Sequence, residues 1–283
     1  MREEALEVLC CPLCHGALEL EAEESRGSNI LSGYLTCRAC KRAYRVRNGV
    51  PDLLPREVLR GRDERWMRAY DRMARSYYIM MHGLIPALSL GTEPLARSRW
   101  VNVLGLRPGA VVLDIATGTG RNLPFLVRRV GRKGLIFAMD VSKGVIAYAA
   151  RLIRAKRWTN VELQRANASC LPYKDSAFDG VLHVGGINTF EDRRRALAEM
   201  LRVAKPGARV VVVDEGLEPS RRKTLRGRLL LRMNALYASE PPVNELPEDV
   251  SDLSVEWGVV PSWAIPMWPF YVMSFRRPRR PRR

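Results

Sequence analysis

Residues 111–120, which read VVLDIATGTG, constrain the fold more strongly than any other stretch of the chain. The first five form a β-branched apolar run of the kind that a buried parallel strand needs. A glycine-rich turn follows, and residues 121–130 then show the apolar spacing of a helix. A strand, a glycine turn and a helix in this order open a doubly wound α/β fold, whose ligands bind at the carboxyl ends of the strands. The sequence therefore predicts a ligand site at this turn.

The spacing of the glycines distinguishes between the nucleotides that such a turn can bind. Gly118 and Gly120 supply the first two glycines of the dinucleotide fingerprint, but Leu123 stands at the third position. A pyrophosphate is therefore disfavoured, and Asp114 beside the turn favours a ligand that carries positive charge. Asp140 ends the next strand, where a carboxylate accepts hydrogen bonds from ribose hydroxyls. A cationic nucleoside with a free ribose is S-adenosylmethionine, which we predict as the cofactor.

Four further motifs follow the turn in order. They are Asp140-Val141-Ser142, Asn167-Ala168 with Leu171-Pro172-Tyr173, Phe178-Asp179, and the stretch from Glu199 to Gly207. Together with residues 114–120 they resemble the ordered motifs of class I S-adenosylmethionine-dependent methyltransferases, most closely the branch of the ubiquinone/menaquinone C-methyltransferases. The resemblance covers residues 66–275. It implies a Rossmann-like, doubly wound sheet of seven strands, the last of them antiparallel.

The resemblance also implies a set of cofactor-binding residues. They are Tyr77, Asp114, Ala116, Thr117, Gly118, Thr119, Gly120, Asp140, Val141, Asn167, Ala168 and Gly185. The family usually has Asp at position 167 to bind the adenine amino group, and Asn keeps a carbonyl oxygen for that contact. Tyr77 lies in the segment that covers the cofactor in this branch, where a Tyr-Asp pair is usual, but Tyr78 replaces the Asp. Gly185 follows the fourth strand, whose end faces the sulfonium.

The other elements continue the α/β alternation. We expect helices at 142–156 and 193–203, strands at 135–139, 161–164, 180–184 and 209–214, and a last strand at 270–275. Residues 219–237 predict one basic amphipathic helix, and the acidic residues 241–252 predict a loop. The uncharged stretch 258–275 contains prolines that exclude a spanning helix. The arginine-rich tail 276–283 is predicted to be disordered.

The first 55 residues predict a separate zinc ribbon. Two Cys-x-x-Cys pairs, Cys11 with Cys14 and Cys37 with Cys40, are separated by 22 residues. Each pair can place two thiolates on one side of a tetrahedral zinc, and four thiolates leave no open position for catalysis. Cys10 is an alternative ligand, whereas His15 is poorly placed. The segment resembles the zinc-ribbon protein that activates several RNA and protein methyltransferases, and the ribbon of some ribosomal-RNA guanine methyltransferases.

These patterns divide the chain into three regions. Residues 1–55 are the ribbon, 56–100 are a helical linker and active-site cap, and 101–283 are the sheet domain with its basic tail. Within the cap, residues 66–77 show helical spacing of aromatic and methionine side chains. The apolar segment 79–90 fits two interpretations, a cap over an apolar substrate pocket or part of the core.

No catalytic residue is assigned from the sequence. Methyl transfer from a sulfonium is an in-line displacement, and the protein chiefly aligns donor and acceptor and excludes water. His82, His183 and Tyr77 are the candidates for a general base, but His183 lies inside a strand and is expected to be a core imidazole. Glu215 and Glu218 are expected to be solvated acids at the rim of the site.

The acceptor remains open between two classes. The apolar segments favour a small apolar or aromatic molecule, whereas the net charge of +17 and the ribbon favour RNA as the alternative. Of the 47 basic residues 40 are arginine, a skew that resembles codon usage more than a nucleic-acid surface. An Asn-Pro-Pro-Tyr signature of base methylation is absent after strand four, where the chain reads Gly-Gly-Ile-Asn188. A catalytically idle, cofactor-binding adaptor is a third interpretation.

The location follows from what the sequence lacks. The amino terminus has no apolar core of a signal peptide, and no run of about 18 apolar residues predicts a membrane span. We therefore expect a cytoplasmic protein, with contact to a membrane surface possible only through its basic segments.

Overall fold

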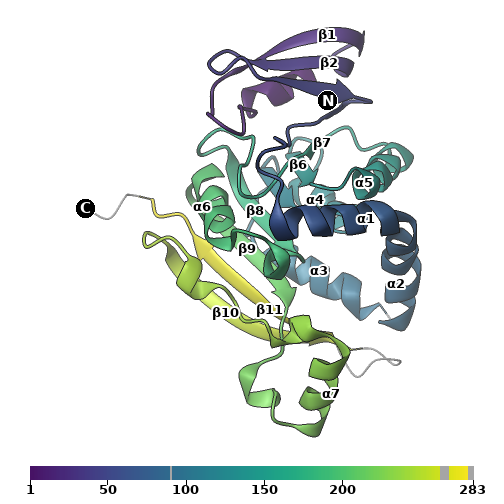
Figure 1. Ribbon diagram of the computed structural model, residues 1–283, viewed down its shortest axis with the longest axis vertical. Coiled ribbons are helices and arrows are strands. Elements are labelled where there is room, and N and C mark those ends of the chain that lie inside the picture. The colour runs from purple at the N-terminus through teal and green to yellow at the C-terminus, as the bar shows by residue number, and fades with distance from the viewer. Residues whose placement is uncertain (90, 262–267, 280–283) are drawn as a thin grey trace.

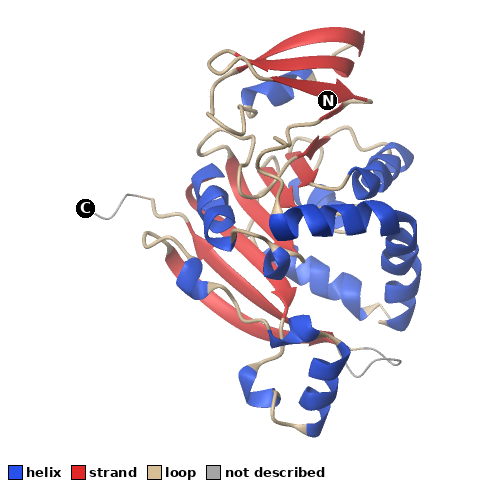
Figure 2. Ribbon diagram, in the orientation of Figure 1, coloured by secondary structure: helices blue, strands red, loops and turns tan. Residues whose placement is uncertain are grey.

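A computed structural model describes residues 1–89, 91–261 and 268–279 of the chain. Figure 1 shows the ribbon domain at one end, a central sheet covered by helices, and a helical projection around α7 at the opposite end. The layers of helix and strand are distinct in Figure 2. Within the described residues no helix is long and apolar enough to cross a bilayer.

The central sheet has the order β10-β11-β9-β8-β5-β6-β7. The strands are β5 (Val111–Ile115), β6 (Leu135–Asp140), β7 (Val161–Arg165), β8 (Phe178–Val184), β9 (Ala204–Glu215), β10 (Ser251–Val260) and β11 (Trp268–Arg276). The first five pair in parallel, and β11 pairs antiparallel with both β9 and β10. The predicted Rossmann-like sheet of seven strands is therefore confirmed, together with its antiparallel end. The strand order reverses at β5, which is where such sheets bind ligands.

Helices cover both faces of the sheet because its strands are apolar on both sides. The helices that follow strands are α4 (Leu123–Val130), α5 (Lys143–Lys156) and α6 (Arg193–Val203). Val112 of β5 packs into one hydrophobic cluster, while Leu113 and Ile115 pack into the other. The helix expected at 121–130 begins two residues later, because Arg121 belongs to the turn and pairs with Glu93.

The ribbon is a small antiparallel sheet. Its strands are β1 (Leu18–Arg26), β2 (Asn29–Cys37), β3 (Ala43–Arg47) and β4 (Val50–Pro51), in the order β1-β2-β3-β4, after a short helical turn at Glu3–Glu7. The two cysteine pairs lie at the same end of this sheet, since Cys37 ends β2 and pairs with Leu18 at the start of β1.

The ribbon is docked on the edge strand β7 of the large sheet. Leu53 donates its backbone N–H to the carbonyl of Arg165 at 2.8 Å, and Asp52 forms an ion pair with the Arg165 side chain at 3.0 Å. Cys10 donates its backbone N–H to Pro172 at 2.9 Å. One hydrophobic cluster runs from the ribbon into the sheet domain and includes Leu53 and Tyr173. The two predicted regions thus share a core, and the ribbon covers an edge that would otherwise expose unpaired backbone groups.

The predicted cap is a run of helices over the carboxyl ends of the strands. It comprises α1 (Gly61–Ile79), a π-helical turn (Met80–Leu84), α2 (Ile85–Leu88) and α3 (Thr92–Val103). The apolar segment 79–90 forms the turn and α2, and residue 90 lies outside the described residues. Ile79 and Leu84 are exposed, so this segment is not a core element.

The carboxy-terminal region corrects two predictions. Residues 219–237 form no single helix but a 3₁₀ turn at Pro219–Arg221, the helix α7 (Leu225–Met233) and a second 3₁₀ turn at Ala235–Ala238. Thr224 caps α7 by accepting the N–H of Gly227, which is why the helix starts there. Residues 241–252 are largely a loop, with a 3₁₀ turn at Val243–Glu245, and β10 begins at Ser251.

The tail is ordered at its start. Arg276 ends β11 and binds Asp252, and the Arg277 guanidinium donates to the carbonyls of Arg202 and Ala204 at 2.7 Å. The expectation of disorder from residue 276 is therefore wrong for these two arginines, because buried carbonyl groups need their donors. Residues 280–283 of the tail, and residues 262–267 of the uncharged stretch, lie outside the described residues.

The shared core yields a stability prediction. Leu53→Ala should lower the free energy of unfolding by about 2–5 kcal/mol, because it leaves a cavity between the ribbon and the sheet domain. The matched control Leu253→Ala removes a side chain that is 41% exposed on β10. It should change the free energy of unfolding by about 0.5 kcal/mol or less. Urea unfolding followed by tryptophan fluorescence and circular dichroism measures both. Two separate transitions, of which Leu53→Ala moves only one, would contradict a shared core.

Candidate functional site

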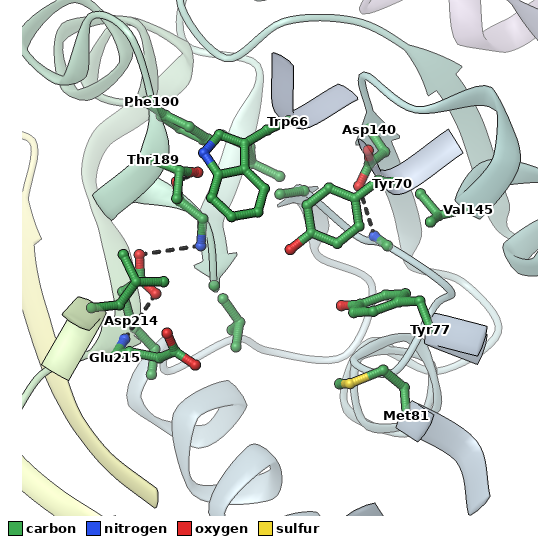
Figure 3. A pocket seen from close by; sticks show the side chains of 18 of the residues that line it. Trp66, Tyr70, Tyr77, Met81, Asp140, Val145, Thr189, Phe190, Asp214 and Glu215 are labelled. Atoms are coloured by element: carbon green, nitrogen blue, oxygen red, sulfur yellow. Dashed lines mark hydrogen bonds between the residues drawn. The ribbon is translucent and has the colours of Figure 1, made fainter. Parts of the chain in front are cut away.

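A pocket of about 410 Å³ lies at the carboxyl ends of the parallel strands, beneath the cap. Its wall combines the turn after β5, the ends of β6, β7, β8 and β9, and side chains of α1 and α3. Figure 3 shows Asp140 at one end and Asp214 and Glu215 at the other, with Trp66 and Tyr70 of α1 between them and Tyr77 next to Tyr70. The position is the one expected from the reversal of strand order at β5.

The turn after β5 is held by a buried carboxylate. Asp114 is inaccessible to solvent and accepts hydrogen bonds from Thr117 Oγ1 at 2.6 Å and Asn122 Nδ2 at 3.0 Å. Burial raises the pKa of Asp114 to about 6. The backbone turns sharply here, with left-handed φ angles of 55° at Ala116 and 57° at Gly118. Asp114 therefore fixes the shape of the turn from behind the pocket wall.

The carboxylate of Asp140 lies on the pocket wall. Its Oδ2 accepts the N–H of Gly118 at 3.0 Å, and its Oδ1 accepts the N–H of Ser142 at 3.0 Å. Burial raises the pKa of Asp140 to about 6, against the opposing effect of these backbone donors. The two oxygens offer about four acceptor positions in all, so the carboxylate can still bind a hydroxyl group in the pocket.

Helix α1 is pinned over the pocket by an acid that the sequence reasoning missed. Asp71 Oδ1 accepts a hydrogen bond from the Ser142 hydroxyl at 2.6 Å and from the N–H of Gly144 at 2.9 Å, at the start of α5. A Cβ on Gly144 would lie 2.8 Å from Cβ of Ala74, so glycine permits the close approach of the two helices. A carboxylate at a helix N-terminus is stabilising, which is the signal that could have paired Asp71 with α5.

A second acid of α1 lies beside Asn167 at the end of β7. Asn167 Oδ1 accepts the N–H of Ser169 at 2.7 Å, so its Nδ2 is left to donate to Asp63 Oδ2 at 2.9 Å. Asp63 also accepts the N–H of Glu191 through Oδ1 at 2.9 Å. Asp63 and Asn167 both line the pocket. Asn167 thus replaces the aspartate that the family usually has after β7, but the carboxylate of Asp63 from α1 lies next to the same position.

Aromatic rings of α1 form the roof between these acids. Tyr70 and Tyr77 meet edge to face with ring centroids 5.2 Å apart, and Trp66 lies 6.0 Å from Tyr70. A Cβ placed on Gly118 would lie 3.6 Å from the Tyr77 hydroxyl, so Tyr77 packs over the glycine turn. Burial raises the pKa of Tyr77, which keeps the phenol protonated.

The cap helix α3 brings opposite charges to the wall. Glu93 and Arg97 both line the pocket, and buried Glu93 pairs with Arg97 and with Arg121 of the turn. Arg97 Nη1 also donates to Asn122 Oδ1 at 2.6 Å, and Asn122 in turn binds Asp114. This buried chain of hydrogen bonds joins α3 to the turn after β5, so the cap and the turn are held as one unit.

The far end of the pocket contains two acids with different partners. Asp214 Oδ2 accepts the N–H groups of Gly186 and Asn188 at 3.1 and 2.8 Å, and burial raises the pKa of Asp214 to about 7. Glu215 accepts one side-chain bond, from Asn234 Nδ2 at 3.2 Å, and burial raises its pKa. The prediction that Glu215 is a solvated rim acid is wrong, because the end of β9 turns into the pocket. Glu218 pairs with Arg221 away from this pocket.

The pocket wall includes eight of the twelve predicted cofactor residues: Tyr77, Ala116, Gly118, Asp140, Val141, Asn167, Ala168 and Gly185. The other four, Asp114, Thr117, Thr119 and Gly120, lie behind it in the buried turn. Thr119 binds His82 Nε2 at 3.0 Å, which ties the π-helical turn of the cap to the glycine turn. Neither His82 nor His183 lines the pocket.

Two of the three candidate general bases, His183 and His82, lie outside the pocket wall. His183 is inaccessible to solvent, its Nδ1 lies 3.2 Å from the carbonyl oxygen of Ile115, and burial lowers its pKa to about 4. It is a neutral core imidazole, as its place within a strand predicts. Burial also lowers the pKa of His82. Asn188, which ends the Gly-Gly-Ile-Asn stretch after β8, donates through Nδ2 to the carbonyl of Glu215 and accepts from the Tyr271 hydroxyl.

The four predicted metal ligands of the ribbon converge. The Sγ atoms of Cys11, Cys14, Cys37 and Cys40 all lie within 4.8 Å of one another. The Cys14–Cys37 and Cys11–Cys40 pairs are 3.4 and 3.7 Å apart, too far for disulfides and close to the roughly 3.8 Å edge of a tetrahedral zinc–thiolate site. Cys10 stays outside this cluster, buried against the sheet domain. The donor set therefore fits zinc. A Cβ on Gly16 would lie 3.0 Å from the Cys37 sulfur, so the backbone at this glycine passes close to the cluster.

Comparison with known families agrees with this geometry. Residues 60–224, more than half of the chain, match the ubiE/COQ5 methyltransferase family. The chain belongs to that family. It is therefore placed among the S-adenosylmethionine-dependent methyltransferases, as the sequence motifs predicted. Residues 2–49 match the Trm112p-like proteins, which confirms the resemblance seen in the ribbon.

Individual relatives carry quinone-pathway names. The ubiquinone/menaquinone biosynthesis C-methyltransferase UbiE of Hahella chejuensis is 32% identical over 148 residues, which cover 52% of this chain and 58% of that protein. The demethylmenaquinone methyltransferase of Bacillus mycoides is 28% identical over 153 residues, covering 54% and 63%. The chain thus spans less than two thirds of the length of these relatives.

Solved structures support the fold. Phosphoethanolamine N-methyltransferase 2 of Haemonchus contortus, in complex with S-adenosyl-L-methionine, has a TM-score of 0.51 at 14% identity, over 65% of this chain and 52% of that one. The YcgJ protein of Bacillus subtilis has a TM-score of 0.50 at 15% identity, over 65% and 98%. At these identities the likeness concerns the sheet domain's architecture alone.

Proposed function

We propose that the protein transfers the methyl group of S-adenosylmethionine to a small, apolar, aromatic acceptor of the quinol class. The observation that carries this proposal is the two-ended pocket. One end holds the glycine turn and Asp140, which suit a nucleoside. The other end is lined by the aromatic rings of Trp100, Trp268 and Phe270 and by the carboxylates of Asp214 and Glu215. These groups suit an aromatic molecule with a hydroxyl group. The quinone-pathway names of the relatives support the same class.

The cofactor end offers one partner for each part of the nucleoside. Asp140 is proposed to accept the ribose hydroxyls, since it ends β6 and keeps free acceptor positions. The adenine base then extends toward the neighbouring strand β7. There Asp63 can accept a hydrogen bond from the adenine amino group. Asn167 cannot, because its own amide group donates to Asp63. The ammonium and carboxylate of the methionine part match the charges of Glu93 and Arg97.

The protein's part in the reaction is alignment and exclusion of water. S-adenosylmethionine, when bound, supplies a methyl group on a sulfonium, a good leaving group. Tyr70, Tyr77 and Trp66 cover the reaction space, so water is kept from it. An aromatic carbon becomes nucleophilic when a hydroxyl on the same ring loses its proton. Glu215 is proposed to take that proton, because burial raises its pKa and, among the described residues, Asn234 is the one side chain that donates to its carboxylate.

We propose a structural role for zinc in the ribbon. Cys11, Cys14, Cys37 and Cys40 supply four thiolates, so no position remains open for a substrate. The ribbon has a small core of its own and packs on the sheet domain, and metal binding therefore stabilises both. The zinc would thus act on catalysis only through the fold.

The metal proposal gives the first prediction of this section. Purified protein should contain one zinc per chain by elemental analysis, and Cys14→Ser with Cys37→Ser should lose it and lower the unfolding midpoint of the whole chain. The matched control Cys10→Ser leaves the metal content unchanged, since Cys10 lies outside the cluster. Full metal content in the double variant would rule out these four ligands.

The cofactor role of Asp140 can be measured without turnover. Asp140→Ala should weaken binding of S-adenosylhomocysteine by about 1.5–3 kcal/mol, because charge-assisted hydrogen bonds to the ribose are lost. The ribose needs the ionised carboxylate, whose pKa in the free protein is about 6. The affinity should therefore rise with pH up to about 6 and level off above it. This pH dependence should be absent in Asp140→Asn. Isothermal titration calorimetry between pH 5 and 8 gives the comparison.

The role of Asp63 at the adenine end of the pocket can be tested in the same experiment. Asp63→Ala should weaken binding of S-adenosylhomocysteine but leave the affinity for its inosine analogue unchanged, because the analogue lacks the amino group. Asp71→Ala, which removes an acid of the same helix that does not line the pocket, is the comparison for general loosening of α1. Equal losses for both ligands in Asp63→Ala would remove Asp63 from the adenine contact.

The acceptor class is tested by following labelled methyl groups. Label from S-adenosylmethionine should enter the total lipid extract of cells, in an aromatic product, and not total RNA. With the identified acceptor, Glu215→Gln should lower kcat by about 10²–10⁴-fold, the range of general base catalysis, with unchanged binding of S-adenosylhomocysteine. Glu218→Gln, outside the pocket, is the matched control. Label at one defined RNA position would replace the quinol proposal by the RNA alternative.

A further inference from the structure

Helix α7 exposes a stripe of apolar side chains. Leu225, Leu229 and Met233 are 79%, 50% and 53% exposed, the first of these among the most exposed large apolar residues of the described chain. Their spacing of four residues puts them on one face of the helix. The helix is anchored to the protein through Leu230, which lies about 100° around the helix from the centre of this stripe, is 1% exposed and packs with Leu217 and Tyr237. The helix is therefore fixed in place with its apolar stripe facing outward.

Cations border this stripe on both sides. At about 100° per residue, Arg228 and Arg232 lie on one side of the stripe and Arg226 lies on the other. The side chains of these three and of Lys223 are exposed and have no ion-pair or hydrogen-bond partner within the part of the chain that the structure describes. Residues 219–239 contain no Asp or Glu. The outer face of α7 is thus apolar along its middle and positive along both borders.

The carboxyl end of α7 leads directly into the pocket wall. Met233 is followed by the 3₁₀ turn Ala235–Ala238, whose Leu236 lines the pocket. The cap contributes further exposed apolar side chains, Ile79 and Leu84, beside Met81 and Ile85 of the pocket wall. In Figure 1, α2 and α7 both lie away from the ribbon, with α7 at the far end of the molecule.

We propose that α7 binds the surface of an anionic lipid bilayer, lying in the headgroup layer with Leu225, Leu229 and Met233 inserted toward the acyl chains. An apolar stripe bordered by arginines is the pattern of helices that lie in a membrane interface. The cations contact lipid phosphates, whose negative potential attracts such clusters. A nucleic-acid site would use the cations but would gain nothing from three exposed apolar side chains, so the bilayer accounts for both features.

Docking of α7 would place the pocket at the membrane surface. If the acceptor is an apolar molecule, as the proposed function has it, it could then enter past Leu236 without crossing water. This consequence rests on the proposed function, but binding to the bilayer does not. Vesicle binding and methyl transfer therefore test the two proposals separately.

The test is co-sedimentation of the full-length, zinc-loaded chain with vesicles. Vesicles of phosphatidylcholine mixed with phosphatidylglycerol should bind the protein, vesicles of phosphatidylcholine alone should bind it weakly, and added salt should reduce binding. Leu225→Glu with Leu229→Glu should weaken binding by at least about tenfold, because acids replace the inserted side chains. Replacing Arg226, Arg228 and Arg232 by Gln should weaken it similarly and remove the salt dependence.

Leu253→Glu is the matched control for the leucine variants. Leu253 is 41% exposed on β10 and lies outside α7, so binding should stay at the wild-type level. Each variant is checked for an unchanged unfolding midpoint, which the exposure of the replaced side chains predicts. Absence of binding to anionic vesicles, or equal binding by wild type and both α7 variants, overturns the proposal. RNA binding that is lost in the arginine variant and kept in the leucine variant, without vesicle binding, overturns it in favour of nucleic acid.

Discussion

The pocket depends on three carboxylates that are buried at or near the carboxyl ends of parallel strands of the central sheet. Asp114, Asp140 and Asp214 end or nearly end β5, β6 and β9, and each accepts hydrogen bonds from the loop that follows or from the loop beside it. Burial raises the pKa of each one, to between about 6 and about 7, which reflects the penalty of holding a charge away from water. Hydrogen bonds offset that penalty, from side chains to Asp114 and from backbone N–H groups to Asp140 and Asp214, and in doing so they fix the loops that form the pocket wall. Two of the three carboxylates line the cavity, and the third shapes the turn from behind.

The cap and the ribbon complete this arrangement from outside the sheet. Helix α1 uses Asp63 and Asp71 to reach the ends of β7 and β6, so the roof of the pocket is tied to its floor by hydrogen bonds. The ribbon covers the free edge of β7 and shares one hydrophobic cluster with the sheet domain. The module that carries the four-cysteine cluster thereby supports the strand that precedes Asn167. The match of residues 2–49 to the Trm112p-like proteins describes a module that is here part of one folded chain.

Charge is distributed over this molecule with a clear division of roles. Many arginines are used within the fold, as when Arg165 binds Asp52 or Arg277 donates to buried carbonyls. The net charge of +17 therefore does not describe one binding surface. The cations of α7 differ because they lack partners in the described structure and border an apolar stripe. That combination, and not the total charge, is what points to a lipid surface.

The sequence by itself determined the sheet, the turn and the four cysteines, because these depend on local patterns. Strand β5 and its glycine turn follow from the run of β-branched residues and from Gly118 and Gly120, and the cysteine spacing predicts which four thiols converge. Only the tertiary structure decided the acids of α1, the place of Glu215 in the pocket and the exposed stripe of α7. Asp63 meets Asn167 across 104 positions of the chain, and no local pattern records such a pairing. The helix predicted at 219–237 was divided because Thr224 caps α7 part-way along the segment. Its apolar stripe was left outward because the packing of Leu230 with Leu217 and Tyr237 sets its rotation.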